Sequence, residues 1–223
     1  VDKLHKGRVG VASQSGALQT AMFIRAFDAG IGFSSAITLG NQADLELSDG
    51  FEYLVDDPDT DAILLYVEGL KDYARFKKAA LRARAVNKPV VAVKAGRTDA
   101  GAAMANSHTA SLTGSYEAFS ALCESLGIVV TDQPDTAVFC ADALARWGAP
   151  KANGVAVASG SGGAVALAAD VIDDGTFHAA RLGSNAIAHL KAHLPVRKET
   201  ANVDFGAYTR AFDPAVMRDT LET

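Results

Sequence analysis

The sequence predicts an α/β fold: a doubly wound parallel sheet followed by a second, smaller α/β unit. Short apolar runs alternate with helical patterns through the first 148 residues, which is the rhythm of strands joined by crossover helices. The runs are almost wholly apolar and rich in β-branched residues, as expected of parallel strands that helices cover on both faces. Most helical patterns also end at a Gly, Asn or Pro stop signal.

The elements of the first unit, residues 1–148, follow from this alternation. Strands are expected at residues 8–13, 35–39, 62–67, 89–94 and 127–130. Helices are expected at residues 17–29, 47–55, 72–86, 115–126 and 135–147. The segment between residues 95 and 114 is rich in small residues and is expected to form a flexible loop. Five strands with their helices complete one doubly wound domain.

A second unit, residues 149–223, is expected after a linker-like stretch at residues 147–154. Its predicted elements are strands at residues 154–159 and near 177–182, and helices at 164–174 and 185–193. Residues 194–208 show no regular pattern. These strands are too few for a whole doubly wound domain, so we expect this unit to be truncated or reduced.

Composition excludes several classes of function. The 21 basic and 26 acidic residues give a net charge of −5 without a Lys/Arg-rich stretch, which argues against nucleic acid as a partner. No apolar run approaches the ~18 residues that span a bilayer, and the sequence has no secretion signal, so we expect a soluble cytoplasmic protein without a membrane partner. Cys123 and Cys140 lack metal-ligand or redox spacing and are expected to be core residues.

The loop after the first strand is a candidate anion site. Ser13, Gln14, Ser15, Gly16 and Ala17 lead directly from a strand into a helix. Backbone amides at a helix start, with about half a positive charge from the helix dipole, bind anions, and the two hydroxyls can add donors. A simple helix cap is the competing interpretation. The full GxGxxG fingerprint of a dinucleotide site is absent.

Two further loops carry groups for chemistry. Glu68 directly follows the third strand, where its carboxylate could orient an imidazole. His108 follows the fourth strand in the loop of small residues, which would leave its imidazole exposed. Ligands of open α/β sheets bind beyond the carboxyl ends of the strands, so we expect His108, Glu68 and the first loop to converge there. Either residue alone would be read as an ordinary surface residue.

The second unit repeats the first loop. Ser161, Gly162 and Gly163 lead into the helix expected from residue 164, and a second helix start aimed at the same anion would stabilise it further. Tight glycine packing is the alternative. His189 and His193 have the spacing of a zinc helix, but Leu190 stands where that motif needs a glutamate, so no metal site is predicted.

At these residues the chain resembles the nucleoside-diphosphate-forming acyl-CoA synthetases, the superfamily of ADP-forming acetyl-CoA synthetase and the succinyl-CoA synthetase α subunit. The shared motifs are SQSGAL at 13–18, LGNQAD at 39–44, DDPDTDAILLYVEGL at 56–70, KAGRTDAG at 94–101, SHTASLTG at 107–114 and SGGAVALAAD at 161–170. The resemblance implies a flavodoxin-like fold of the succinyl-CoA synthetase kind. It places His108 at the phosphorylated histidine, Glu68 at the glutamate that holds it, and the loops at 13–17 and 161–163 at the phosphate cradles.

The resemblance also implies the reaction and its components. An acid, ATP and CoA would give acyl-CoA, ADP and phosphate through an acyl phosphate and a phosphohistidine. ATP with Mg²⁺ and CoA would be substrates bound mainly by an ATP-grasp domain and a CoA-binding Rossmann domain, neither of which is expected within these residues. The chain alone is therefore expected to be inactive, to have no tightly bound cofactor and to act in an oligomer.

Two other functions remain open at this point. The first is a non-catalytic regulatory or scaffold module of a synthetase-like fusion, which would need neither His108 nor Glu68. The second is a flavodoxin-like domain that binds a nucleotide or flavin tightly, and the absorbance spectrum of the purified protein would test the flavin version.

Overall fold

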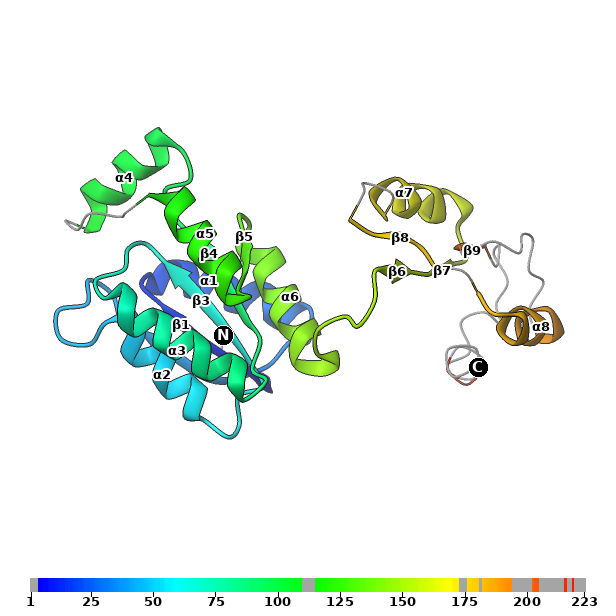
Figure 1. Cartoon of the computed structure of the whole chain (residues 1–223), viewed down its shortest axis with the longest axis horizontal. Helices are drawn as coiled ribbons and strands as arrows, with labels where there is room; N and C mark the ends of the chain where they lie inside the picture. The colour runs from blue at the N-terminus through cyan, green and yellow to red at the C-terminus, as the bar shows by residue number, and fades with distance from the viewer. Residues whose placement is uncertain are drawn as a thin grey trace. The chain divides into compact units, whose positions relative to one another are not determined.

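The chain divides into two compact units, residues 1–149 and 150–223 (Figure 1). The structure is a computed structural model that describes residues 4–109, 115–172, 176–180, 182–193, 202–204, 215 and 218, with the backbone alone at 106–109, 189–191, 193 and 202–204. Within this described part, no helix is long and apolar enough to cross a membrane.

The first unit is built on a five-stranded parallel sheet. Its strands are β1 (Lys6–Ser13), β2 (Phe33–Thr38), β3 (Ala62–Val67), β4 (Val90–Lys94) and β5 (Val129–Thr131). They lie side by side in the order β2-β1-β3-β4-β5. This order is that of a flavodoxin-like doubly wound sheet, which confirms the predicted fold class. The connections reverse direction between β1 and β3, so the switch point of the fold lies there.

Helices cover both faces of this sheet. On one face lie α1 (Gly16–Asp28) and α6 (Pro134–Trp147), and on the other lie α2 (Leu47–Asp56), α3 (Tyr73–Ala85) and α5 (Tyr116–Leu126). Alternate strand residues feed the two cores: Val11 packs with α1 and α6, whereas the adjacent Ala12 packs with the other three helices. The strands are apolar throughout because both of their faces are buried.

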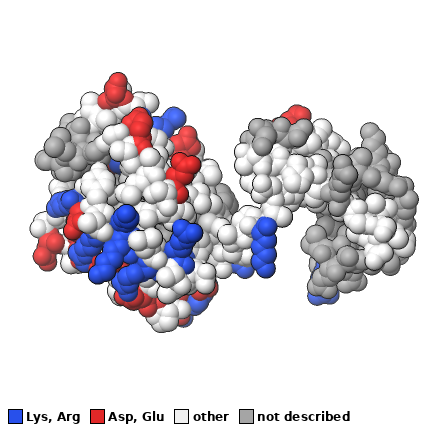
Figure 2. Space-filling view, viewed as in Figure 1, with Lys and Arg blue, Asp and Glu red and all other residues white. Residues whose placement is uncertain are grey.

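Aromatic side chains join the three helices of the second face. The rings of Phe51 on α2 and Phe76 on α3 are 5.4 Å apart, and those of Phe76 and Phe119 on α5 are 6.0 Å apart. All three rings are fully or almost fully buried. The outer surface of α2 and α3 carries charges of both signs, interspersed over the face that Figure 2 shows. There Arg75 on α3 contacts carboxylates that α2 and its N-cap provide.

The segment after β4 differs from the prediction. Residues expected as a flexible loop form helix α4 (Asp99–Thr109), so the backbone of His108 is helical and lies in the last turn (Figure 1). The side chain of Thr98 accepts a hydrogen bond from Gly101 N at 3.2 Å, and its carbonyl accepts one from Ala102 N at 2.7 Å. Alanine is the strongest helix former, so the run of small residues favours a helix once Thr98 caps it.

The second unit contains four short strands and two helices among its described residues. They are β6 (Gly154–Val155), β7 (Val157–Ser159), α7 (Gly162–Ile172), β8 (His178–Ala179), α8 (Ser184–His193) and β9 (Asn202–Asp204). The single strand expected at residues 154–159 is split, because β6 pairs with β8 whereas β7 pairs with β9. The β9 strand lies in the stretch for which no regular structure was expected. Pairing between distant segments decides both points, and a local pattern does not contain it.

Candidate functional site

The carboxyl ends of β1 and β3 place two predicted site loops next to each other at the switch point. The two strands pair up to Ser13 and Tyr66, and beyond them Gln14 N donates a hydrogen bond to the carbonyl of Tyr66 at 3.3 Å. The loop that begins α1 and the loop that carries Glu68 therefore start from neighbouring strands. This is the edge of the sheet at which ligands of such folds bind.

Two serines shape the turn from β1 into α1. The Ser13 hydroxyl is fully buried; it donates to the Ser15 carbonyl at 2.8 Å and accepts from Ser15 N at 3.1 Å. The Ser15 hydroxyl caps α1 by accepting from Leu18 N at 3.3 Å. Gly16 and Ala17 are exposed and occupy the first two positions of the helix, where backbone N–H groups have no acceptor within the helix. The geometry needed for an anion site is thus present in the backbone, while both hydroxyls serve the turn itself.

Close packing explains why glycine occupies the first position of α1. A Cβ atom built on Gly16 would lie 3.3 Å from Cγ2 of Thr38, at the end of β2. A larger side chain would press against the neighbouring strand. The absence of a side chain also leaves the first amides of the helix open on the exposed side.

Gln14 ties the first loop to the loop of Glu68. Its side chain is 5% exposed, and its Oε1 accepts hydrogen bonds from Glu68 N and from Gly69 N, the latter at 3.1 Å. Its Nε2 donates to the carbonyl of Gly69 at 2.7 Å. The side-chain amide of Gln14 is therefore committed to the backbone at residues 68 and 69. Its backbone N–H donates to the carbonyl of Tyr66, so the part of Gln14 in phosphate binding stays a prediction.

Lys94 holds the same backbone from the other side. It ends β4, is 5% exposed, and its Nζ donates to the carbonyls of Glu68 at 2.9 Å and Ala95 at 2.7 Å. Burial lowers the pKa of Lys94, because removal from water disfavours the ammonium form, and the nearby Glu68 carboxylate acts in the opposite direction. A buried lysine thus contacts the backbone of Glu68, and its ammonium group also interacts electrostatically with the Glu68 carboxylate.

The half-buried phenol of Tyr66 also interacts electrostatically with the Glu68 carboxylate. Its pKa rises to about 12, first because of burial and then because the Glu68 carboxylate opposes a second negative charge. Tyr66 is therefore neutral at physiological pH. Glu68 itself is partly exposed, so a group that approaches this edge of the sheet can reach it.

The loop after β2 completes this edge. Leu39 N donates to the carbonyl of Ser13 at 2.9 Å, which joins the loop to the first turn. Gln42 has a positive φ of 55°, and its Oε1 accepts from Leu47 N at 2.8 Å, where α2 begins. Lys71, three residues after Glu68, donates from Nζ to the carbonyl of Gln42 at 2.6 Å. The three loops after β1, β2 and β3 are therefore held together by hydrogen bonds.

His108 is the site residue whose side chain the structure does not describe. Its backbone lies in the last turn of α4, the helix that follows β4 and Lys94. The predicted meeting of its imidazole with Glu68 lies outside the described residues and stays a prediction. Because the segment is helical, any approach of the imidazole to Glu68 involves the end of a helix rather than a loop.

The start of α7 in the second unit repeats the two-serine turn. Ser161 N donates to the Ser159 hydroxyl at 3.2 Å, as Ser15 N does to the Ser13 hydroxyl. The Ser161 hydroxyl then accepts from Ala164 N at 3.3 Å and caps the helix. Gly162 and Gly163 are exposed at the first two helical positions. Each unit therefore contains one amide-lined helix start of the same design.

Burial makes the two cysteines poorly suited to chemistry. Cys123 is fully buried and its thiol pKa rises to about 12 through burial, which also raises the pKa of the half-buried Cys140. Both thiols are thus poor nucleophiles at neutral pH. His189 and His193 lie on α8, and their side chains are outside the described residues.

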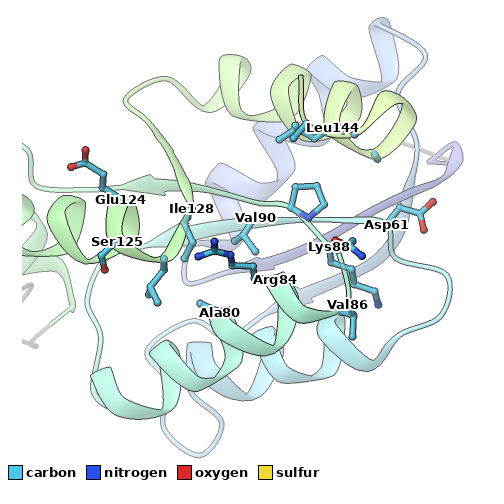
Figure 3. A pocket seen from close by; sticks show the side chains of 17 residues that line it. Asp61, Ala80, Arg84, Val86, Lys88, Val90, Glu124, Ser125, Ile128 and Leu144 are labelled. Atoms are coloured by element: carbon cyan, nitrogen blue, oxygen red, sulfur yellow. The ribbon is translucent and has the colours of Figure 1, made fainter. Parts of the chain in front are cut away.

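A cavity of about 770 Å³ lies at the opposite edge of the sheet (Figure 3). It is lined by residues at or before the starts of β3, β4 and β5, such as Asp61, Val90 and Ile128, and by the last turns of α3, α5 and α6. Arg84 and Glu124 contribute charges to its walls. None of the predicted site residues lines this cavity, so it is separate from the site at the switch point.

Sequence reasoning missed three residues at this edge: Lys94, Tyr66 and Lys71. The sequence pattern predicts Lys94 only as the end of a strand, and Tyr66 only as part of one. A lysine that ends an otherwise apolar buried strand was the available signal, because a buried ammonium needs partners. No comparable signal marked Lys71, whose partner lies 29 residues away.

Comparison with known proteins gives the context of this site. The succinyl-CoA ligase like flavodoxin domain family matches residues 6–144. The alpha subunit of ADP-forming acetate–CoA ligase II from Pyrococcus furiosus is 39% identical over 209 residues, which cover 93% of this chain and 45% of that relative. ADP-forming acetate–CoA ligase I from Archaeoglobus fulgidus is 39% identical over 197 residues, covering 88% of this chain and 28% of that protein.

Solved structures agree with these relatives. The dinucleotide forming acetyl-coenzyme A synthetase 1 of Ca. Korarchaeum cryptofilum, in complex with phosphate and ADP, superposes with a TM-score of 0.81 and 29% identity. The match covers 92% of this chain and 45% of that one, so the chain spans less than half the length of these relatives. Because the family matches more than half of the chain, and the motifs lie where the fold places its site, the chain belongs to the succinyl-CoA ligase like flavodoxin domain family, within the superfamily of nucleoside-diphosphate-forming acyl-CoA synthetases.

Proposed function

We propose that this chain supplies the phosphohistidine-bearing part of an ADP-forming acyl-CoA synthetase, which joins a carboxylic acid to CoA while ATP is cleaved to ADP and phosphate. His108 is the phosphorylated residue and Glu68 orients its imidazole. The observation that carries the proposal is the position of Glu68 at the switch point, where Gln14 joins it directly to the turn that begins α1. A carboxylate and an amide-lined helix start thus lie on adjacent loops.

The reaction proceeds in three transfers. A nitrogen of the neutral His108 imidazole attacks the γ-phosphorus of ATP, and the bond between that phosphorus and the ADP oxygen breaks. A carboxylate oxygen of the acid then attacks the phosphorus, the P–N bond breaks, and an acyl phosphate forms. Finally the sulfur of CoA attacks the acyl carbon, the C–O bond to phosphate breaks, and the thiol proton leaves with the phosphate.

Glu68 keeps the imidazole ready for both phosphoryl transfers. Its carboxylate accepts a hydrogen bond from the imidazole N–H that does not bear phosphorus, which fixes the tautomer and holds that proton in place. The backbone N–H groups of Gly16 and Ala17, with the positive end of α1, stabilise the phosphoryl oxygens. Ser13, Gln14 and Ser15 shape that turn. Ser161, Gly162 and Gly163 supply a second helix start of the same kind.

The complete enzyme contributes the other substrates. ATP with Mg²⁺ is bound by an ATP-grasp domain or subunit, and CoA by a Rossmann domain, so residues 1–223 act together with these parts to complete the reaction. The named activity of several relatives is acetate–CoA ligation, which supports a small carboxylic acid as the substrate. We expect the working form to be an oligomer in the cytoplasm.

Phosphate labelling tests the role of His108. The chain is incubated with γ-labelled ATP and an ATP-grasp domain, or with labelled acetyl phosphate, which carries the phosphoryl group of the second transfer. We expect an acid-labile, base-stable phosphate on the wild-type chain. His108→Asn should abolish it, and Glu68→Gln should slow its formation about a hundredfold, because orientation and proton control at the imidazole are lost.

His5→Asn is the matched control. The His5 ring stacks on Phe27 at 4.9 Å, just before β1 begins, and therefore lies away from the switch point. This variant should be labelled like the wild type. Label that persists in His108→Asn would show that another residue carries the phosphate. A chain that supports CoA ligation equally well with and without His108 would instead be a non-catalytic module.

A further inference from the structure

Lys94 occupies a position where a lysine is costly for folding. It ends a strand whose other residues are valines and alanine, all buried, and its own side chain is 5% exposed. Its register partner on β3 is Val67, an apolar residue. An apolar side chain would satisfy the packing at this position, and burial penalises an ammonium group. The lysine therefore calls for an explanation beyond the stability of the sheet.

The ammonium group joins two segments that separate at this point. One hydrogen bond goes to the carbonyl of Glu68, in the loop after β3, and the other goes to the carbonyl of Ala95, the first residue after β4. The backbone turns at Gly96, whose φ is +81°, and α4 begins three residues later. Lys94 thus connects the backbone of the Glu68 loop to the base of the segment that carries His108.

The geometry at this junction leaves little freedom. Ala95 N also donates to the carbonyl of Val67 at 2.9 Å, so the departing chain is held by β3 and by Lys94 together. A Cβ atom on Gly96 would lie 3.2 Å from the Cα atom of Ala102, inside the first turn of α4. Gln14 fixes residues 68 and 69 from the side of β1. Lys94 supplies the corresponding contact from the side of β4.

We propose that Lys94 is a positioning residue for the phosphoryl transfer, which fixes the departure point of the His108 segment relative to Glu68. This inference rests on the function proposed above. Lys94 acts through the backbone of the Glu68 loop and the base of the α4 segment, which its ammonium group joins. Its loss should slow phosphoryl transfer without changing how tightly ATP binds.

The test compares Lys94 with Lys88, because the ammonium groups of both lysines donate hydrogen bonds to backbone carbonyls. In the complete enzyme, Lys94→Met is expected to lower the rate of His108 phosphorylation between about tenfold and a hundredfold, as misplacement of reacting groups does, with the KM for ATP unchanged. Lys94→Gln, which keeps a neutral hydrogen-bond donor, should also lower the rate of His108 phosphorylation. Lys88→Met is the control, because Nζ of Lys88 donates to three backbone carbonyls, those of Leu54, Val55 and Asp57, at the opposite edge of the sheet.

Lys88→Met should lower the thermal midpoint and leave the phosphorylation rate of the folded protein unchanged. Wild-type rates in both folded Lys94 variants would overturn the inference. So would equal rate losses in the Lys94 and Lys88 variants that follow the fraction of unfolded protein. Label that persists in His108→Asn would instead refute the proposed function, so the two failures are distinguishable.

Discussion

Gln14 fills a buried position between two loops that are 54 residues apart in the sequence. Its amide has one acceptor and two donors in a fixed plane, which suits a backbone segment that offers two N–H groups and one carbonyl. The neighbouring residues Lys94 and Lys71 hold other carbonyls of the same edge. At the scale of single residues, the site is therefore positioned by side chains that satisfy backbone groups of another loop.

Replacement of Gln14 tests this arrangement. Gln14→Leu leaves two N–H groups and one carbonyl without their partner, and unsatisfied buried polar groups cost about 1–3 kcal/mol. We expect the free energy of unfolding, measured in urea, to fall by about 2 kcal/mol. Gln19→Leu is the control, since that equally buried side chain accepts one hydrogen bond from Thr38. Equal losses of unfolding free energy in the two variants would contradict the proposed role of Gln14 in joining the two loops.

The two helix starts, at α1 and α7, show how one element design recurs. In each unit a serine two residues upstream shapes the turn, and the next serine caps the helix. The glycine that follows keeps the first helical amides open. The weak similarity between VGVASQSGAL and VAVASGSGGA is thus reflected in matching hydrogen bonds. At the scale of elements, the same device can provide a helix cap and an anion site together, because the cap uses the third amide and leaves the first two.

The cap of α1 makes a prediction for this element. Ser15→Ala removes the acceptor of Leu18 N and should lower the free energy of unfolding by about 1 kcal/mol. Urea unfolding followed by circular dichroism measures the change. In the same helix, Thr20→Ala is expected to have no comparable cost, because this exposed side chain donates only to the carbonyl of Gly16 and alanine is the better helix former. If Ser15→Ala is as stable as the wild type, the serine does not stabilise α1 and its role is in binding alone.

The whole molecule has two units, and its large apolar cores belong to the first. Both clusters of buried apolar side chains found among the described residues lie between residues 9 and 145. The second unit has the buried Ile172 on α7, whereas Leu167 and Val171 on the same helix are 71% and 72% exposed. Stability at the scale of the whole chain should therefore depend mainly on the first sheet.

A shortened chain tests this division. We propose that the first domain ends near residue 148, and we expect residues 1–149 to fold alone. Their unfolding should be cooperative, with a urea midpoint close to that of the main transition of the complete chain, because both core clusters are retained. Circular dichroism would follow the transition. Loss of cooperative unfolding would show that the second unit is needed for the first to fold.

Acid should weaken the first unit for an electrostatic reason. The pKa of Asp49 is lowered by the hydrogen bond from Glu46 N, and the pKa values of Glu52 and Asp61 are lowered by Arg75 and Arg8 respectively. A carboxylate whose pKa is lower in the folded state contributes stability above its unfolded pKa, about 4, and loses it as the pH falls through the folded value. The unfolding midpoint should thus be steady from pH 7 to about 5 and fall below about pH 4.

Arg75→Met provides the control for this pH dependence. The variant removes the cation that contacts Asp49 and Glu52, at a cost of at most about 1 kcal/mol near neutral pH, as for other surface pairs. Its stability should consequently decline less steeply than that of the wild type below pH 4. Parallel curves for the two proteins would mean that other carboxylates cause the acid loss.

Local sequence patterns were sufficient for most of the first unit. The strand at 62–67 was predicted to the residue, and the five predicted helices differ from the structure by one residue at one or both ends. The prediction was wrong at α4, where the sequence was expected to form a loop although its alanines and a threonine cap favour a helix. It failed again at β6 and β7, whose partners lie far along the chain.

The sequence by itself determined the fold class, the serine turn before α1 and the acidic residue after β3, because hydrophobic periodicity, capping and strand ends are local properties. The tertiary structure alone decided that the side chains of Gln14 and Lys94 form hydrogen bonds with the backbone at residues 68 and 69. Those contacts depend on the order β2-β1-β3-β4-β5, which brings β1 and β4 to either side of β3. Strand order is a property of packing between distant segments, so these two sets of contacts were not contained in any local pattern.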